Sequence, residues 1–552
     1  MTENSEEKKT PGQIVKDSMA ELQQTAVAFV KAPKALWGVN IPYVIEGLIY
    51  FGILTILGKF CSENIQLTDL QAGWVYSLVT AGITLAMLFL GGVSDKIGVR
   101  KALILAFVLF FVGRGIIALS GTLSLGHGLF SPMFFMLITG LFIMVVAYGL
   151  YQPAAYAGVK RYTNPQTAAM GYAVVYGLMN LGAFFSGFIS PFVRHRFETV
   201  FPPNGLTAVF WVYTALVMVA LLVTVSILTP KTDSNAVERM ARETEKMEAE
   251  GKTQEEITEN VEKKKRAEDA AEKHRTDMAA ISNLMLYLYG IITVAALVVL
   301  GLVHTGKIPT ATASVHFGMK PIEWTLSIGV LLFIGFATWE FLRKRPTHPF
   351  RDKRFTFFIF ILIPVQTLFA HNWLTLPYYL DRAFRGGMVS QYFEFFSNLN
   401  PILIFFLAPI VAGLTARANV YRMMVIGTLV MAAPTFLLAF GPNVYLFLTY
   451  VLLMSVGEAM WQPRFLQWIA EIAPEGQTGL YMGIGQFPWF LTKMVTGFYS
   501  GYFVAKYLPR PESGLPTHSG QMWLIYAFIA MISPIALILA SGWMKKGMHG
   551  KA

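Results

Sequence analysis

The sequence predicts an all-α membrane protein with about 14 transmembrane helices, because apolar segments of spanning length run through almost the whole chain. Of its 552 residues, 55% are hydrophobic and only 14% are charged, whereas an ordinary soluble domain has about 25% charged residues. One long charged block, from Lys231 to about Ala280, interrupts the apolar segments. Six segments precede this block and about eight follow it, which indicates two six-helix bundles plus a two-helix insertion.

The apolar segments are expected to be helices because a backbone in lipid must satisfy its own hydrogen bonds. Strands of a membrane barrel would be about ten residues long and would alternate in polarity. The expected spans before the charged block are 40–60, 72–92, 101–119, 131–157, 171–193 and 207–229. Those after it are 284–304, 324–342, 355–380, 396–416, 421–441, 444–470, 478–505 and 521–544.

The spans and the charged block divide the chain into six parts. They are a cytoplasmic N-terminal segment (1–36), an N-terminal six-helix bundle (37–230), a charged cytoplasmic linker (231–282), an inserted helical hairpin (283–345), a C-terminal six-helix bundle (346–545) and a cytoplasmic tail (546–552). Pairs such as Glu238 and Arg242 stand one turn apart in the linker, which supports a solvated helix. A solvated connector is favoured over a regulatory arm.

The loops carry an uneven distribution of positive charge. Lys96, Arg100 and Lys101 follow the second span, whereas the loop 120–131 contains no Lys or Arg. Basic loops remain in the cytoplasm, so both termini are expected there, although Arg194 and Arg196 fall on the opposite side. The net charge of +11 is therefore interpreted as cytoplasmic loop charge in a bilayer, not as a nucleic-acid surface. We expect a monomer.

The loop after the second span reads Gly91-Gly-Val-Ser-Asp-Lys-Ile-Gly-Val-Arg-Lys101. It resembles the signature loop of the major facilitator superfamily, G-x-x-x-D-R/K-x-G-R-R/K, with Val99 in place of one basic residue. This resemblance implies a major facilitator fold. It also implies a loop that latches the cytoplasmic side, with the gating residues Gly91, Asp95, Lys96, Gly98, Arg100 and Lys101.

Five further stretches follow the order of motifs in proton-dependent oligopeptide transporters. They are Tyr43–Gly52, Gly149–Pro153, Gly171–Phe184, Asn398–Pro401 and Gly457–Glu458. The sequence resembles this family from the first span into the tenth. The resemblance implies that Asn180, Asn400 and Glu458 face the substrate. Three charged positions of the family are replaced by neutral residues, namely Tyr43 for a glutamate, Gly47 for an arginine and Gln152 for a lysine.

Five ionisable residues lie inside apolar spans, where each costs roughly 2.5–3.5 kcal/mol or more at the membrane centre. They are Glu46, Arg114, His371, Glu458 and Lys493. Carboxylates and an imidazole can load and release protons, and Arg114 can supply a counter-charge. Proton coupling is therefore assigned to Glu46, Arg114, His371 and Glu458. The alternative is a buried structural ion pair.

Polar and aromatic side chains within the spans are candidates for the substrate site, because aromatic rings give shape and polar groups fix orientation. The predicted substrate-binding residues are Tyr50, Gln152, Tyr176, Asn180, Gln366, Asn372, Trp373, Asn400 and Glu458. Packing in the helix bundle is the alternative for each aromatic residue.

These features predict secondary active transport of a small polar organic solute by alternating access, coupled to protons. Short peptides or amine-bearing compounds are the expected substrates, and a bacterial inner membrane is the expected location. A proton-independent uniporter or exporter, and a transporter-like sensor, remain as alternatives. No G-x-x-x-x-G-K-S/T loop and no nucleophile–base pair is visible, and the single Cys61 excludes a cysteine-based metal site. We expect no enzyme activity, no cofactor and no metal.

Overall fold

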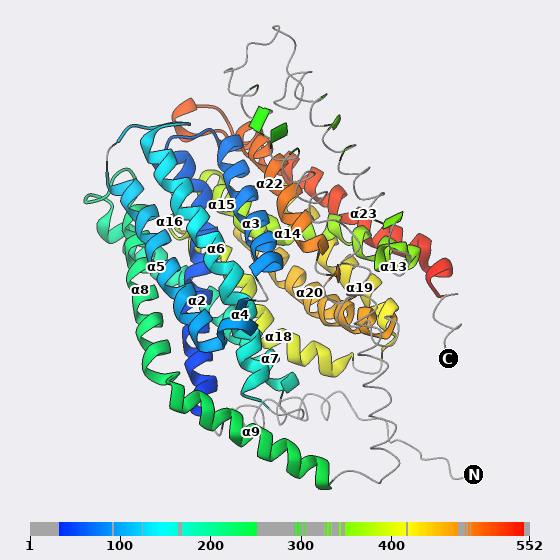
Figure 1. Cartoon of the computed structure of the whole chain (residues 1–552). Helices are drawn as coiled ribbons and strands as arrows, with labels where there is room; N and C mark the ends of the chain where they lie inside the picture. Colours follow the sequence, from blue (N-terminus) through cyan, green and yellow to red (C-terminus); the bar gives the residue numbers. More distant parts are fainter. Residues whose placement is uncertain are drawn as a thin grey trace. The chain divides into compact units, whose positions relative to one another are not determined.

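The computed structural model describes two long stretches of the chain (Figure 1). The first covers 32–90, 93–123, 125–163 and 168–250, and the second covers 348–415, 418–472 and 487–545, with isolated residues between 292 and 343 and between 481 and 485. Almost all of these residues are helical, and no strand occurs among them. The expected spans 284–304 and 324–342 lie largely outside the described residues.

The helices of the first stretch match the six spans expected there. They are α2 (Lys34–Lys59), which continues into a π-helical turn η1 (Phe60–Asn64), α3 (Asp69–Leu90), α4 (Val93–Ile97), α5 (Val99–Thr122), α6 (Pro132–Arg161), α7 (Ala168–Phe197) and α8 (Leu206–Ile227). Ser131 begins α6 by accepting a hydrogen bond from the Phe134 amide at 3.1 Å, and Pro132 occupies the first turn, where a missing N–H costs nothing.

The second stretch contains more interrupted helices. They are η2 (Pro349–Arg351), α13 (Lys353–Ile361), α14 (Ile363–Leu374), α15 (Leu376–Ala383), α16 (Met388–Gln391), α17 (Phe393–Ser397), α18 (Leu399–Leu414), α19 (Val420–Ala432), η3 (Ala433–Phe440), α20 (Val444–Ile472), α22 (Phe487–Tyr507), η4 (Pro511–Ser513) and α23 (Ser519–Lys545). Within the described part of the chain, ten helices are long and apolar enough to cross a membrane. The shorter apolar helix Phe393–Ala408 and α22 occupy two further expected spans.

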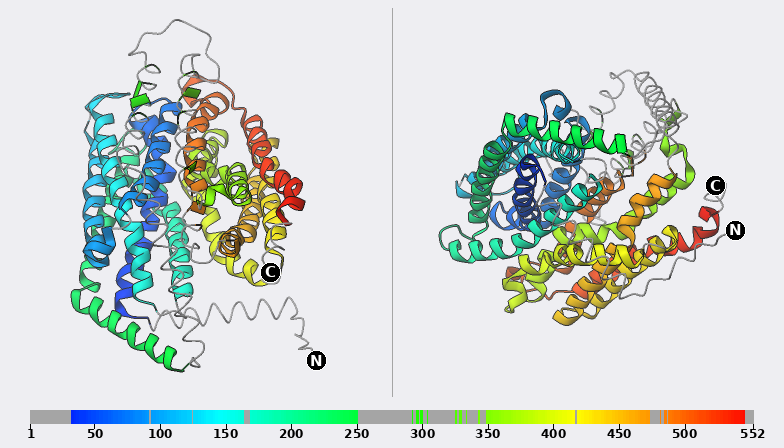
Figure 2. Two further views of the ribbon diagram at one scale, coloured as in Figure 1. Left: turned by 45° about the vertical axis from the view of Figure 1, so that its right-hand side comes forward. Right: turned by 90° about the horizontal axis from the view of Figure 1, so that it is seen from below.

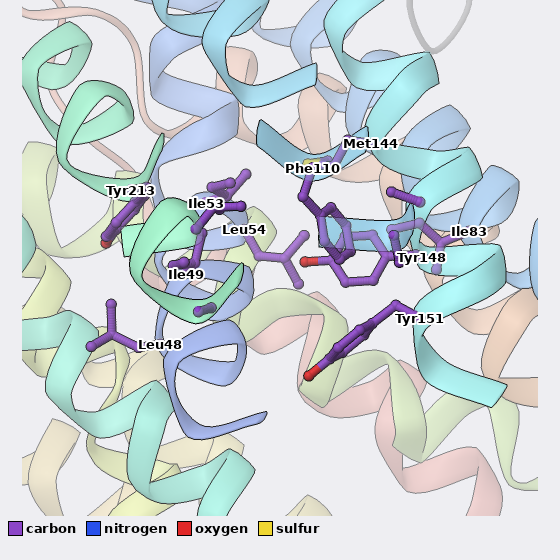
Figure 3. Close-up of a cluster of buried hydrophobic side chains, with 14 of the residues drawn as sticks. Leu48, Ile49, Ile53, Leu54, Ile83, Phe110, Met144, Tyr148, Tyr151 and Tyr213 are labelled. Atoms are coloured by element: carbon purple, nitrogen blue, oxygen red, sulfur yellow. The ribbon is translucent and has the colours of Figure 1, made fainter. Parts of the chain in front are cut away.

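Packing of the first six spans rests on close contacts between neighbouring helices. α5 packs against α6 and α8, and α2 packs against α7 and α8 (Figure 2). A Cβ added at Gly113 of α5 would lie 2.8 Å from the Gly140 carbonyl oxygen of α6, so glycine permits this crossing. Figure 3 shows the buried core between these helices, to which Ile53, Phe110 and Tyr148 contribute.

The charged linker begins as a helix. α9 (Pro230–Glu250) follows α8, with Ala236 and Met240 buried and most of its charged residues exposed. Asp233 accepts hydrogen bonds from Arg161 at 3.0 Å and from the Tyr162 hydroxyl at 2.9 Å, which attaches the start of α9 to the end of α6. The remainder of the linker lies outside the described residues.

The contacts divide the chain into two compact units. The first comprises Met1–Gly251, Ile361–Gln467 and Pro488–Ser541, and the second comprises Lys252–Phe360, Trp468–Phe487 and Gly542–Ala552. Within the second unit, the rings of Phe358 and Trp468 pack with centroids 3.8 Å apart. The first unit contains the cavity described next.

Candidate functional site

A cavity of about 250 Å³ lies between helices of the N-terminal and C-terminal halves, within the first compact unit. Its walls come from α2, α3, α6 and α7 on one side of the sequence and from α14, α18, α20 and α22 on the other. Aromatic rings dominate the lining, which includes Tyr43, Tyr50, Phe51, Tyr148, Tyr151, Tyr176, Phe369, Trp373 and Trp489. Polar and charged groups are few, namely Glu46, Thr84, Gln152, Asn180, Asn400, Glu458, Gln462 and Lys493.

One wall of the cavity is formed by the crossing of α2 and α7, which requires glycine on both helices. A Cβ added at Gly47 would lie 2.9 Å from the Met179 carbonyl oxygen, and one added at Gly182 would lie 2.4 Å from the Val44 carbonyl oxygen. Real Cβ atoms do not approach backbone this closely, so position 47 offers no room for a side chain. Position 47 therefore contributes only backbone to this cavity.

Beside this crossing, Glu46 is held in a buried ion pair with Arg114 of α5. The two guanidinium terminal nitrogens donate to the two carboxylate oxygens, with Nη1 to Oε2 at 2.7 Å. Arg114 also donates to the Tyr148 hydroxyl at 2.8 Å, and that hydroxyl donates to Glu46. Both charged side chains are almost completely buried, at 3% exposure for Glu46 and 0% for Arg114. Arg114, the predicted counter-charge, thus neutralises Glu46, and only the carboxylate of the pair lines the cavity.

A second polar group on the N-terminal half surrounds Gln152 of α6. Its Nε2 donates to the Tyr43 hydroxyl at 3.1 Å and to the Tyr156 hydroxyl at 3.3 Å. The rings of Tyr43 and Tyr151 stack with centroids 5.9 Å apart. Positions 43 and 152 therefore form one neutral hydrogen-bonded cluster.

Across the cavity, Glu458 of α20 has a neutral environment. Asn400 of α18 donates to its Oε2 at 2.8 Å and to the Ser455 hydroxyl at 3.0 Å. Glu458 forms no ion pair with any described residue, although it is only 5% exposed. The cavity therefore contains one carboxylate that is balanced by a cation and one that is not.

Most of the predicted substrate-binding residues meet at this cavity. Its lining includes Tyr50, Gln152, Tyr176, Asn180, Trp373, Asn400 and Glu458, together with the predicted proton carrier Glu46. The Trp373 ring packs against Phe51 with centroids 5.2 Å apart, which places a C-terminal ring on an N-terminal one.

Four of the predicted substrate-binding and proton-coupling residues do not line the cavity. Besides Arg114, they are Gln366, Asn372 and His371. Gln366 accepts a hydrogen bond from Thr492 at 3.1 Å. The His371 ring lies 2.8 Å from the Thr375 hydroxyl and 3.0 Å from the Tyr499 hydroxyl, and it stacks on Tyr526. These contacts show that His371 packs against other residues of the C-terminal half, on a different face of α14 from Trp373.

Other lining residues were not among the predicted site residues. Tyr148 and Tyr151 lie three positions apart on α6, and Trp489 and Lys493 lie four apart on α22. That spacing places each set on one helical face. The spacing is visible in the sequence, but the spans are apolar on all sides, so it does not show which face meets the cavity.

Buried and half-buried ion pairs also join the two halves of the chain near the C-terminal end of α2. Lys59 pairs with Asp381 of α15 and with Glu63 at 2.7 Å. Arg382 donates to both carboxylate oxygens of Asp69, at 2.8 and 3.2 Å. A third pair joins Arg194 of α7 to the fully buried Glu394 of α17 at 2.7 Å. Sequence reasoning treated Arg194 only as an exception to the charge bias.

The predicted gating loop is described only in part. Gly98 has φ of +85°, a conformation that favours glycine, and it begins α5. Arg100 donates to the Leu228 carbonyl at 2.7 Å, while Lys96 and Lys101 are exposed. Gly91 and the side chain of Asp95 lie outside the described part.

Comparison with known proteins gives a consistent family. Residues 41–391 match the family model of the Major Facilitator Superfamily. A D-xylose transporter from Levilactobacillus brevis is 34% identical over 128 residues, which are 23% of this chain and 24% of that protein.

Solved structures of peptide transporters have a similar fold. A bacterial homologue of the human drug peptide transporters PepT1 and PepT2 matches with a TM-score of 0.58 and 16% identity, covering 93% of this chain and 99% of that chain. A POT family transporter in complex with 5-aminolevulinic acid matches with a TM-score of 0.57 and 16% identity, covering 93% and 97%.

Proposed function

Because the chain belongs to the Major Facilitator Superfamily, we propose that it is a secondary transporter that carries a small amine-bearing solute by alternating access, coupled to protons. The observation that carries this proposal is Glu458, a buried carboxylate that faces the cavity and has only neutral described partners. A buried carboxylate without a cation costs free energy, and an ammonium group of the solute would remove that cost. Asn400 holds the carboxylate toward the cavity.

The size and lining of the cavity favour a small polar solute with an apolar body. Its volume of about 250 Å³ lies just below the range of about 300–1,000 Å³ typical of ligand pockets. Tyrosine and tryptophan rings supply most of the wall, and amides such as Gln152 and Asn180 supply neutral hydrogen-bonding groups. Dipeptides and compounds of the size of 5-aminolevulinic acid, which one structural neighbour binds, are the leading candidates.

Proton coupling is assigned to Glu458 first and to Glu46 second. Glu46 would have to leave Arg114 before it could take a proton, and this requires breaking a buried bidentate pair. Glu458 can exchange a proton without breaking an ion pair, because its described partners are neutral. Solute amine and proton would then compete for or share one carboxylate.

Alternating access also requires the two halves to separate where ion pairs now join them. The pairs Lys59–Asp381, Arg382–Asp69 and Arg194–Glu394 would break in that step and re-form when the solute has left. We infer a monomer in a bacterial inner membrane, with both termini cytoplasmic. The Gly91–Lys101 loop would then latch the cytoplasmic side, opposite the end that these ion pairs join.

A neutral sugar is the second candidate substrate. The relative from Levilactobacillus brevis is a D-xylose transporter, and amides beside aromatic rings could also bind a sugar. In that case transport would use Gln152, Asn180 and Gln462, and the unpaired charges of the cavity would have no ligand partner.

The first experiment is uptake of labelled L-alanyl-L-alanine into proteoliposomes, with and without an inward proton gradient, for wild type and Glu458→Gln. Gradient-driven uptake that Glu458→Gln abolishes supports the proposal. Uptake that a proton gradient does not change would support a uniporter instead. Uptake of D-xylose, with none of the dipeptide, by protein that elutes as a folded monomer would refute an amine-bearing substrate.

A further inference from the structure

The charged groups that line the cavity do not follow the pattern expected from the related transporters. They are Glu46, Glu458 and Lys493. Arg114 already neutralises Glu46 through two hydrogen bonds. One carboxylate, Glu458, and one ammonium group, Lys493, therefore remain for a solute.

Among its described residues, the N-terminal half supplies no further cation to this cavity. Gly47 has no room for a side chain, because a Cβ there would lie 2.9 Å from the Met179 carbonyl oxygen. Gln152 is a neutral amide bonded to two tyrosine hydroxyls. Arg114 is fully buried behind Glu46 and does not line the cavity.

Lys493 is placed to act as the cation of the cavity. It lies on α22 one turn after Trp489, and both side chains line the cavity. Lys493 is half-buried and forms no ion pair or hydrogen bond with any described residue. An ammonium group inside a membrane bundle normally has a partner.

We propose that Lys493 binds the anionic group of the solute, so that the substrate is a small zwitterion whose two charges are both bound by the C-terminal half. This inference rests on the proposed function and specifies its substrate class. The ammonium group of the zwitterion meets Glu458 on α20 and its carboxylate meets Lys493 on α22. The loaded cavity then contains no unpaired charge, which favours the zwitterion over singly charged analogues.

The N-terminal half has a different role in this arrangement. Its lining groups are neutral apart from the paired Glu46, and Tyr43, Tyr50 and Tyr151 line the cavity around the body of the solute. Selection by charge therefore belongs to one half and selection by shape to the other.

The test compares three labelled probes in uptake and binding by the full chain in proteoliposomes. L-alanyl-L-alanine carries both charges, its C-terminal amide carries only the ammonium group, and N-acetyl-L-alanyl-L-alanine carries only the carboxylate. The variants are Lys493→Gln, the charge-retaining Lys493→Arg and Glu458→Gln. Elution as a folded monomer and an unchanged melting temperature are required of each variant.

Wild type is expected to prefer the zwitterion. Lys493→Gln should lower the affinity for L-alanyl-L-alanine about 10- to 100-fold, which is the loss expected for a charged hydrogen bond. Its affinity for the C-terminal amide should stay within about twofold of wild type. Lys493→Arg should restore much of the loss. In the binding measurement, Glu458→Gln should give the opposite pattern and should leave the affinity for the N-acetyl probe unchanged.

Two results overturn the inference in distinguishable ways. If Lys493→Gln weakens the dipeptide and its C-terminal amide equally, Lys493 does not bind the carboxylate, while the proposed amine transport still holds. If wild type takes up D-xylose and none of the three probes, the proposed function fails together with the zwitterion.

Discussion

Replacing Arg114 by methionine tests whether the buried pair with Glu46 organises the N-terminal half. Methionine has a similar length and keeps the apolar contacts, but it leaves Glu46 with the neutral Tyr148 hydroxyl as its described partner. Both charged side chains are at most 3% exposed, so little water can reach Glu46 to replace the lost cation. Breaking such a pair by removing one partner costs about 3–5 kcal/mol.

The assay is the melting temperature of purified protein in detergent, followed by intrinsic fluorescence. A loss of this size should lower the melting temperature by about 3–4 °C, because an unfolding entropy of about 2.1 cal/mol/K per residue corresponds to about 0.9 °C per kcal/mol in a chain of 552 residues. The double variant Arg114→Met, Glu46→Gln should recover more than half of the loss, because Gln can bond with Tyr148 without leaving a buried charge. Arg114→Lys should lie between, since lysine cannot make the two-point contact.

Two results would refute this reasoning. An unchanged melting temperature for Arg114→Met would mean that the pair contributes little to stability. A double variant as unstable as the single one would mean that Arg114 acts through packing, against Phe110 for example, and that the charge of Glu46 does not matter.

Two further predictions concern the crossing of α2 and α7 and an ion pair that joins the two halves. Gly47→Arg, which introduces the residue of the related transporters, should lower the melting temperature and abolish uptake, because the new Cβ meets the Met179 backbone at 2.9 Å. Gly47→Ala, which adds the same Cβ, should show part of this loss. A fully active Gly47→Arg variant would contradict the close approach of α2 and α7 at this position. Lys59→Met removes the ion pair with Asp381 and should therefore increase the rate at which a maleimide labels the single, fully buried Cys61. Cys61→Ser is the unlabelled control. An unchanged labelling rate would show that this pair does not keep the two halves closed.

Local sequence features were sufficient for the architecture. Apolar runs of about 20 residues report membrane spans without any tertiary information, and the expected segments coincide with α2 to α8 and with most helices from α14 to α23. The loop around Gly98 and the motifs at Asn180, Asn400 and Glu458 pointed to the family and to residues that do line the cavity. These signals are short-range, so one sequence contains them.

Only the tertiary structure decided which charges pair and which remain available. Arg114 and Glu46 are 68 residues apart, and Lys59 and Asp381 are 322 apart. Spans that are apolar on nearly every face show little amphipathicity, so their sequences do not reveal which face meets the cavity. Hence the sequence alone does not distinguish His371 from Lys493, because both are ionisable residues within spans. Helix rotation and packing place His371 against Tyr526 and Lys493 at the cavity wall, because those contacts depend on helices distant in the chain.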